Sequence, residues 1–96
     1  MITNYKSDDF ILNGGYYYSP SFKIESSDDL IAIEMNLSEY GEVSIQSSID
    51  GLNWYNIPNT SFICNPNGLQ SYKECQKDLF YKLKSSVLVN EAKILI

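Results

Sequence analysis

Residues 30–37 form the segment that most restricts what this chain can fold into. Its apolar residues lie two positions apart, at Ile31, Ile33, Met35 and Leu37. Side chains along a β-strand point alternately to its two faces, so this spacing places all four on one face. The segment therefore predicts a strand with one face buried and the other face in water.

The rest of the chain repeats this pattern in shorter pieces. Alternating or apolar runs are separated about every 8–12 residues by Gly, Pro, Asn, Asp and Ser, a spacing typical of antiparallel β-structure. We therefore expect an all-β fold, an antiparallel β-sandwich of immunoglobulin-like or jelly-roll-like type with about 7–8 strands. The length of 96 residues fits a single domain over 1–96, with the polar residues 1–9 as a flexible N-terminal arm.

The same pattern assigns strands and core residues along the chain. Strands are expected at 10–12, 16–18, 22–25, 30–37, 43–46, 55–57, 62–64, 80–83 and 93–96. Residues 69–79 are ambiguous, because their apolar spacing resembles a helix, and the β context slightly favours a strand followed by a loop. The predicted core consists of Ile31, Ile33, Met35, Val43, Ile45, Trp54, Ile57, Phe80 and Leu83.

The segment Ser48–Trp54 carries the strongest turn signal. Asp-Gly between extended segments is typical of a β-hairpin, because the turn positions often require positive φ. The sequence predicts such a turn at Asp50 and Gly51, with Ser48 and Asn53 beside it as structural residues. Trp54, the single Trp, is expected to cover one end of the core.

The charge balance argues against nucleic acid and membrane partners. Seven Lys, no Arg and twelve acidic residues give 7 − 12 = −5, and the chain has no basic cluster to attract phosphate. No segment reaches the length of apolar chain that a membrane span needs, and residues 1–9 do not resemble a signal peptide. We expect a protein that is made and retained in a cytoplasm.

No catalytic, cofactor-binding or metal-binding residues are predicted. The chain has no His, so it lacks both the usual general base near neutral pH and a common zinc ligand. Cys64 and Cys75 are interpreted as free packing thiols, with a disulfide between them as the less favoured alternative. The acid pairs at 8–9 and 28–29 could attract calcium, but solvated turns are the better interpretation. We therefore expect that the chain is not an enzyme.

Eight tyrosines suggest a binding surface. The polar tip and apolar body of Tyr suit protein interfaces, and flat rings can also stack on sugars. A protein interface is favoured over a sugar site. The interface candidates are Tyr16, Tyr17, Tyr18, Tyr40 and Tyr55.

The hairpin segment resembles a module of small β-sandwich proteins in tailed bacteriophages. The shared pattern is Ser-x-Asp-Gly-x-Asn-Trp with a hydrophobic residue about three positions later, filled here by Ser48–Trp54 and Ile57. The segment 80–83 and the final strand 94–96 also fit this outline, although Lys82 stands where Arg is more usual. The resemblance implies a structural virion protein, most economically a capsid auxiliary or decoration protein such as one of a crAss-like phage.

The resemblance also implies partners and a location, and it leaves alternatives open. The expected partners are capsid or other virion proteins, and the expected location is the virion after synthesis in the host bacterial cytoplasm. Because similar hairpins occur in carbohydrate-binding and adhesin sandwiches, a module that binds surface glycans for host adhesion is the alternative. A tail or neck adaptor is a further alternative, and a homo-oligomer also stays open.

Overall fold

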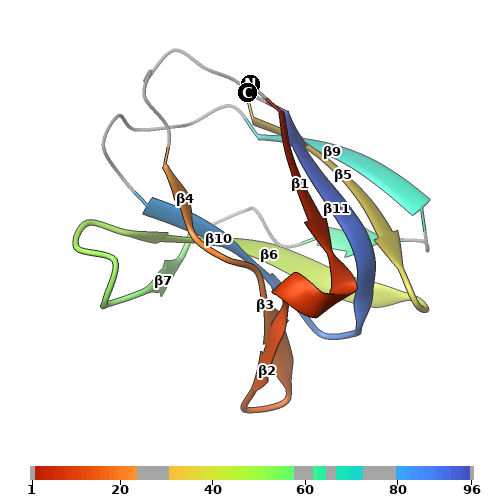
Figure 1. Cartoon of the computed structure of the whole chain (residues 1–96), viewed down its shortest axis with the longest axis horizontal. Coiled ribbons are helices and arrows are strands. Elements are labelled where there is room, and N and C mark those ends of the chain that lie inside the picture. The colour runs from red at the N-terminus through yellow and green to blue at the C-terminus, as the bar shows by residue number, and fades with distance from the viewer. Residues whose placement is uncertain (1, 24–30, 58–61, 65–66, 73–79, 96) are drawn as a thin grey trace.

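A computed structural model of the chain describes residues 2–23, 31–57, 62–64, 67–72 and 80–95, with the backbone alone at 31–32, 62–64 and 67–72. Two antiparallel sheets pack face to face (Figure 1). The first sheet consists, in spatial order, of β1 (Ile2–Lys6), β11 (Val89–Leu95), β5 (Ile31–Leu37) and β9 (Asn67–Tyr72). The second consists of β2 (Ile11–Asn13), β3 (Tyr16–Tyr18), β10 (Phe80–Ser85), β6 (Gly41–Ser48) and β7 (Tyr55–Asn56), with β4 (Phe22–Lys23) on β10 and β8 (Phe62–Cys64) on β6.

The predicted antiparallel β-sandwich is confirmed. The described residues form eleven strands, whereas the sequence suggested about 7–8. β1 and β9 lie where the sequence pattern gave no definite strand, whereas the short strands β4 and β7 lie in segments where it did. In the segment left ambiguous between helix and strand, residues up to Tyr72 are strand, and 73–79 lie outside the described residues.

Two pairs of strands turn the same corner and so connect the sheets. β5 pairs with β11 in the first sheet, and their continuations β6 and β10 pair with each other in the second (Figure 1). At the corner, Ser38 N donates to Leu88 O at 2.9 Å, and Ser86 N donates to Glu42 O at 2.9 Å. The result is one long antiparallel ribbon that bends between the two sheets and holds them in register.

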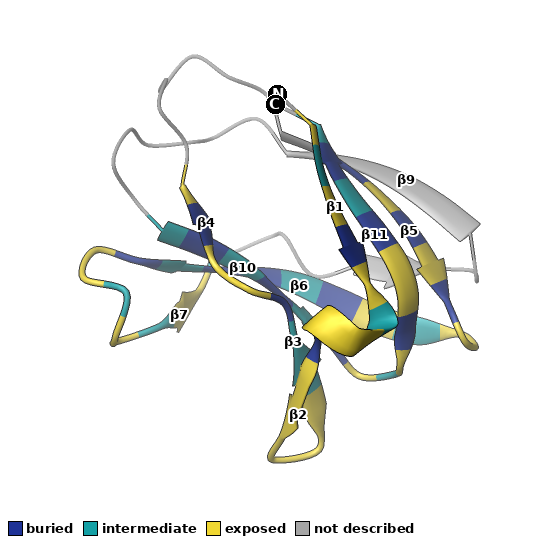
Figure 2. Cartoon of the chain, viewed as in Figure 1, coloured by how far each residue is buried: buried dark blue, intermediate teal, exposed yellow. Residues whose placement is uncertain are grey.

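The inner faces of the two sheets enclose one core (Figure 2). Phe22 and Tyr81 stack at 6.1 Å between ring centres, so aromatic side chains fill part of the space between the layers. The buried apolar residues are Tyr5, Phe10, Phe22, Ile33, Met35, Leu37, Val43, Ile45, Tyr81, Leu83, Val89, Ala92 and Ile94. Five members of the predicted core are therefore in it: Ile33, Met35, Val43, Ile45 and Leu83.

Other parts of the core prediction need correction. Phe80 is not in the core, because it precedes the buried Tyr81 by one residue and so points to the other face of β10. Trp54 is also outside the core. Ile57 is partly buried against the core, and the side chain of Ile31 lies outside the described residues.

The prediction of a flexible arm over residues 1–9 is wrong. β1 pairs with β11 over its whole length, from Ile2 opposite Leu95 to Lys6 opposite Glu91. Tyr5 is buried and meets Phe10 edge to face at 6.3 Å between ring centres. An edge strand needs an apolar residue only where it meets the core, so the polar character of this segment hid its pairing.

Candidate functional site

The outward face of the second sheet carries two lysines from its central strand. In β10 the residues Tyr81, Leu83 and Ser85 are buried. Because side chains alternate along a strand, Lys82 and Lys84 lie on the outside. Both are partly buried, as expected when the aliphatic part of a lysine lies along a sheet and its ammonium group reaches water.

The tyrosines of β3 alternate in the same way. Lys84 of β10 lies opposite Tyr18, and Ser85 lies opposite Tyr17. Tyr17 packs partly buried against the core, whereas Tyr16 and Tyr18 lie on the outward face with the lysines. Tyr17 therefore does not share a face with the other two tyrosines, since neighbouring residues of a strand point to opposite sides.

Each lysine ammonium group lies over aromatic rings. Lys82 Nζ is 4.3 Å from the ring centre of Trp54 and 4.8 Å from that of Tyr18. Lys84 Nζ is 4.1 Å from the ring centre of Tyr16. Such cation–π contacts contribute about 0.5–1 kcal/mol each at exposed sites. We call this group, formed by Tyr16, Tyr18, Trp54, Lys82 and Lys84, the lysine–aromatic face.

Trp54 belongs to this outward face and does not cap the core. It is the residue before β7, and Asn56, two positions on, lies opposite Gln46 of β6. Trp54 lies beside Lys82 and is partly exposed. The prediction of a core cap is thus corrected: Trp54 packs across the outside of the sheet.

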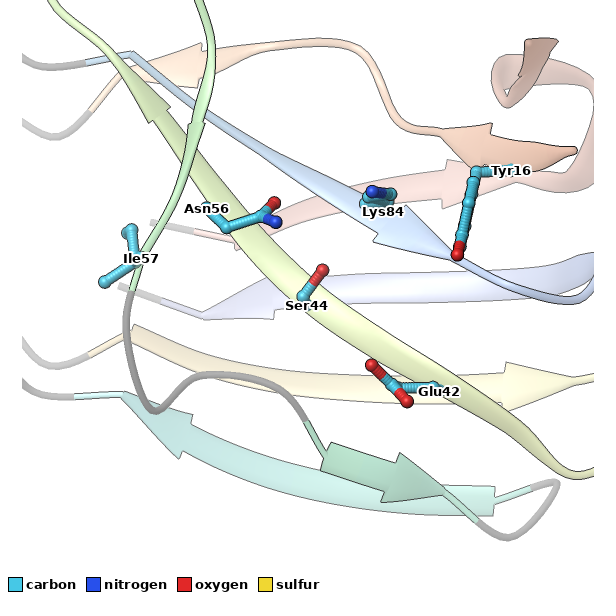
Figure 3. Close-up of a pocket in the computed structure, with 6 residues that line it drawn as sticks. All are labelled: Tyr16, Glu42, Ser44, Asn56, Ile57 and Lys84. Atoms are coloured by element: carbon cyan, nitrogen blue, oxygen red, sulfur yellow. The ribbon is translucent and has the colours of Figure 1, made fainter. Parts of the chain in front are cut away.

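Two shallow hollows open on the lysine–aromatic face. The first, of about 220 Å³, lies between β3, β10, β6 and β7, with Tyr16, Lys84 and Asn56 around it (Figure 3). Ser44 and Glu42 of β6 and Ile57 complete its lining. The second, of about 460 Å³, we call the Gln46 hollow. It is lined by Ile11, Asn13, Tyr18, Ser19, Gln46, Trp54 and Lys82.

The Asp50 carboxylate holds the loop between β6 and β7 together. Its Oδ1 accepts hydrogen bonds from Leu52 N at 2.8 Å, from Asn53 N at 2.9 Å and from Ser48 Oγ at 2.9 Å. Its Oδ2 accepts a hydrogen bond from Asn53 Nδ2 at 2.9 Å, and Ser48 Oγ accepts one from Gly51 N at 2.8 Å. The loop is therefore ordered by its own polar side chains, in the manner of an Asx turn.

The connection is longer than the two-residue turn typical of Asp-Gly. Ser47 lies opposite Tyr55, so the loop spans 49–54. Gly51 has φ of 79°, a conformation that a residue with a Cβ adopts only at a cost. This loop carries Trp54 to the lysine–aromatic face, which is its contribution to the site.

Asp50 should titrate far below the usual carboxyl range. Hydrogen bonds from the backbone of Asn53 and Leu52, followed by those from the side chains of Ser48 and Asn53, lower its pKa from the ordinary 3.8. Because the folded-state pKa is depressed, the stability contributed by Asp50 is complete above pH 3.8 and is lost as the pH falls through the folded value. Carbon-13 NMR titration of the side-chain carboxyls measures this. Asn53→Ala should raise the midpoint, whereas an Asp50 midpoint at or above 3.8 in the unmodified chain contradicts the prediction.

The remaining interface candidates lie apart from the lysine–aromatic face. Tyr40 is exposed at the corner between β5 and β6. Tyr55 is exposed on β7, with alternation sending it to the opposite side from Trp54 and Asn56. Of the five tyrosine candidates, the structure thus brings only Tyr16 and Tyr18 together.

The sequence interpretation missed the lysines and Gln46 as site residues. The alternation of residues 80–85 already carried a signal for Lys82 and Lys84, since a buried Leu83 places its neighbours outside. No local signal pointed to Gln46. Its place opposite Lys82 follows from the pairing of β6 with β10, strands far apart in the sequence.

The sequence also raised acid pairs as calcium ligands and two cysteines as thiols. Asp9 Oδ2 accepts a hydrogen bond from Lys6 N at 2.8 Å, whereas residues 28–29 and the side chains of Cys64 and Cys75 lie outside the described residues. Within the described ranges, no group of three or more His, Cys, Asp or Glu side chains is placed to hold a metal ion. In the same part of the chain, no helix is long and apolar enough to cross a membrane.

Comparison with family models, with curated proteins and with solved structures finds no match to this chain.

Proposed function

We propose that this chain is a non-enzymatic structural protein of a phage virion, an auxiliary or decoration protein that stabilises the capsid by protein–protein contacts. The observation that carries the proposal is the exposure of apolar side chains at two connections of the second sheet. Ile11 and Leu12 of β2 are 69% and 59% exposed, and Ile49 and Leu52 of the loop 49–54 are both 83% exposed. Apolar side chains gathered at a surface are typical of protein interaction sites.

Each of the two connections contributes one residue to the Gln46 hollow. Ile11 of β2 and Trp54 at the end of the loop both line it, whereas Leu12, the neighbour of Ile11 on β2, points to the other face of the strand. We call the exposed residues Ile11, Leu12, Ile49 and Leu52 together the apolar rim. Burying one such side chain contributes roughly 1.5–3 kcal/mol. Many copies, each attached by a small contact, would add up over a symmetric shell.

A paired variant tests the apolar rim. Ile49→Ser combined with Leu52→Ser should weaken co-sedimentation with purified capsids by at least about tenfold, because two exposed apolar anchors are removed. The control is Leu88→Ser, which removes an exposed leucine at the corner between β10 and β11. It should leave binding unchanged. Equal binding by the paired variant and the unmodified chain would place the contact elsewhere.

Copy number in intact particles tests the proposed role as a whole. Quantitative mass spectrometry of separated heads and tails should find the chain in heads, in numbers that match the symmetry of the shell. A number that matches a single ring at the neck or tail would favour an adaptor in place of a decoration protein. Absence from purified particles would overturn the virion proposal.

A further inference from the structure

Two ammonium groups on the lysine–aromatic face lack an acidic partner. Within the described part of the chain, Lys82 and Lys84 form no ion pair and no side-chain hydrogen bond. Among the described side chains, only Gln46 Oε1 is a fully buried polar atom without a hydrogen-bond partner. The two ammonium groups also lack such a partner, so each of them reaches the molecular surface. Each therefore presents N–H donors and a positive charge to a molecule that approaches this face.

The register of the strands fixes the spacing of the two ammonium groups. Lys84 lies directly opposite Tyr18, yet its ammonium group lies over Tyr16, two residues back along β3. Lys82 is two residues earlier on β10, and its ammonium group lies over Tyr18. Both lysines therefore lean in the same direction by the same step. Because alternate residues of a strand are about 7 Å apart, the two ammonium groups form a pair with about that spacing.

The aromatic rings hold these ammonium groups in place. Lys82 Nζ lies 4.3 Å and 4.8 Å from the ring centres of Trp54 and Tyr18, and Lys84 Nζ lies 4.1 Å from that of Tyr16. Burial lowers the pKa of Lys82, so its ammonium group has lost part of its hydration and would gain from an opposite charge. Because the positions are set before binding, a partner that matches them loses less entropy on docking.

The face is positively charged and open at both lysines. The larger hollow lies at Lys82, and the smaller one lies at Lys84 (Figure 3). The described residues that line the two hollows include these two lysines and one acidic residue, Glu42. This face therefore favours a negatively charged partner, although the whole chain carries a net charge of −5.

An acidic segment of a protein matches this arrangement. In an extended chain, side chains at alternate positions lie on one face about 7 Å apart. Asp or Glu at two such positions would bring one carboxylate to each ammonium group, and charge-assisted hydrogen bonds of this kind are stronger than neutral ones. We propose that the lysine–aromatic face docks an extended acidic segment of another protein, with Asp or Glu at alternate positions. This inference does not rest on the proposed function, because the segment could belong to a virion protein or to any other protein.

Two other occupants match this face less well. The twelve acidic residues of this chain include no two that lie two positions apart, so no strand of a second copy supplies the pattern. Single-stranded nucleic acid is a long polyanion and would meet the net charge of −5 of the whole chain. Its bases would also need the ring faces over which the ammonium groups lie.

Two peptides of equal composition and charge test the alternate spacing. One octapeptide repeats Glu-Thr, so its carboxylates lie at alternate positions. The other repeats Glu-Glu-Thr-Thr, so no two of its carboxylates lie two positions apart. The full chain is titrated with each peptide, and the indole resonance of Trp54, the single Trp, is followed by NMR spectroscopy. We expect a saturable shift and at least about threefold tighter binding of the Glu-Thr peptide.

Removing either lysine charge should weaken binding of the Glu-Thr peptide. Lys82→Met and Lys84→Met keep an unbranched apolar side chain and should each lower the affinity by about three- to fivefold, because each removes one ammonium–carboxylate pair. The matched control is Lys93→Met. It removes the same charge from the outward face of the first sheet, since Ala92 and Ile94 on either side are buried. Its affinity should equal that of the unmodified chain.

Four outcomes would overturn the proposal. They are equal binding of the two peptides, a loss with Lys93→Met as large as with the other two variants, no shift of the Trp54 resonance with either peptide, and tighter binding of oligothymidine than of the Glu-Thr peptide. The last outcome would favour single-stranded nucleic acid as the partner. Should one lysine variant fail to fold, the other variant and the two peptides still decide. No capsid is present in this titration, so a negative result leaves the proposed function to its own co-sedimentation test.

Discussion

Replacing Leu83 with Ala is expected to lower the free energy of unfolding by about 2–5 kcal/mol. Leu83 is fully buried on β10, which lies near the middle of the second sheet and faces Ile45 of β6. Its removal leaves a cavity between the two sheets, which the ribbon of paired strands cannot close without losing its register. The free energy of unfolding of a domain of this length is about 5–15 kcal/mol, so the variant loses a large share of its stability.

Urea denaturation followed by Trp fluorescence measures this loss. The matched control is Leu88→Ala, which truncates an exposed leucine at the corner between β10 and β11. Surface substitutions of this kind usually stay within about 0.5 kcal/mol. The core assignment would be contradicted if the two leucine variants lost similar amounts of stability.

Gly41→Ala is expected to destabilise the corner between the sheets by about 1–3 kcal/mol. A Cβ at this position would overlap the Val87 side chain and would lie 3.2 Å from Ser86 Oγ. Ser86 Oγ accepts a hydrogen bond from Glu42 N at 2.9 Å, so a shift there disturbs the junction of β6 with the corner. A valine side chain has few alternative rotamers, and the strain is therefore not easily relieved.

A double-mutant cycle separates this overlap from a general effect of losing glycine. Gly41→Ala is measured by thermal denaturation alone and in a Val87→Ala background, where the overlapping methyl groups are absent. The cost should be smaller in that background, with a coupling of about 0.5–3 kcal/mol between the two positions. The same cost in both backgrounds would show that close approach to Val87 is not the cause.

The fold could be predicted where the apolar and polar residues of a strand alternate along the chain. The alternation of 30–37 and the apolar positions of 43–46 follow from period two alone, and four of their residues, Ile33, Met35, Val43 and Ile45, were correctly assigned to the core. β1 was missed, because an edge strand can be mostly polar and still pair with its neighbour. Its partner β11 begins at Val89, earlier than the apolar run over 93–96 suggested.

The site was predicted only in part, for a related reason. Tyr16 and Tyr18 were identified from composition, yet Tyr17 was included because the alternation of a three-tyrosine run was not applied to the interface. The same omission placed Phe80 in the core beside Leu83. Applying period two to residues 80–85 would have corrected the core and would also have revealed Lys82 and Lys84 on the outside.

The segment Ser48–Trp54 shows where prediction from the sequence ends. Its polar residues indicate a turn, and they do form the hydrogen-bond network around Asp50. What they could not indicate is where the loop directs Trp54. That depends on β6, which pairs with β10 and so places Lys82 beside the Trp54 ring.

The sequence by itself determined the β class, the sandwich architecture and much of the core, because these depend on spacing between neighbours in the chain. Only the tertiary structure decided that Gln46, Lys82, Trp54 and Tyr18 meet around one hollow. These residues come from three strands and a loop, and their meeting depends on register and pairing order. Both are fixed by long-range packing of the two sheets, which no local pattern encodes.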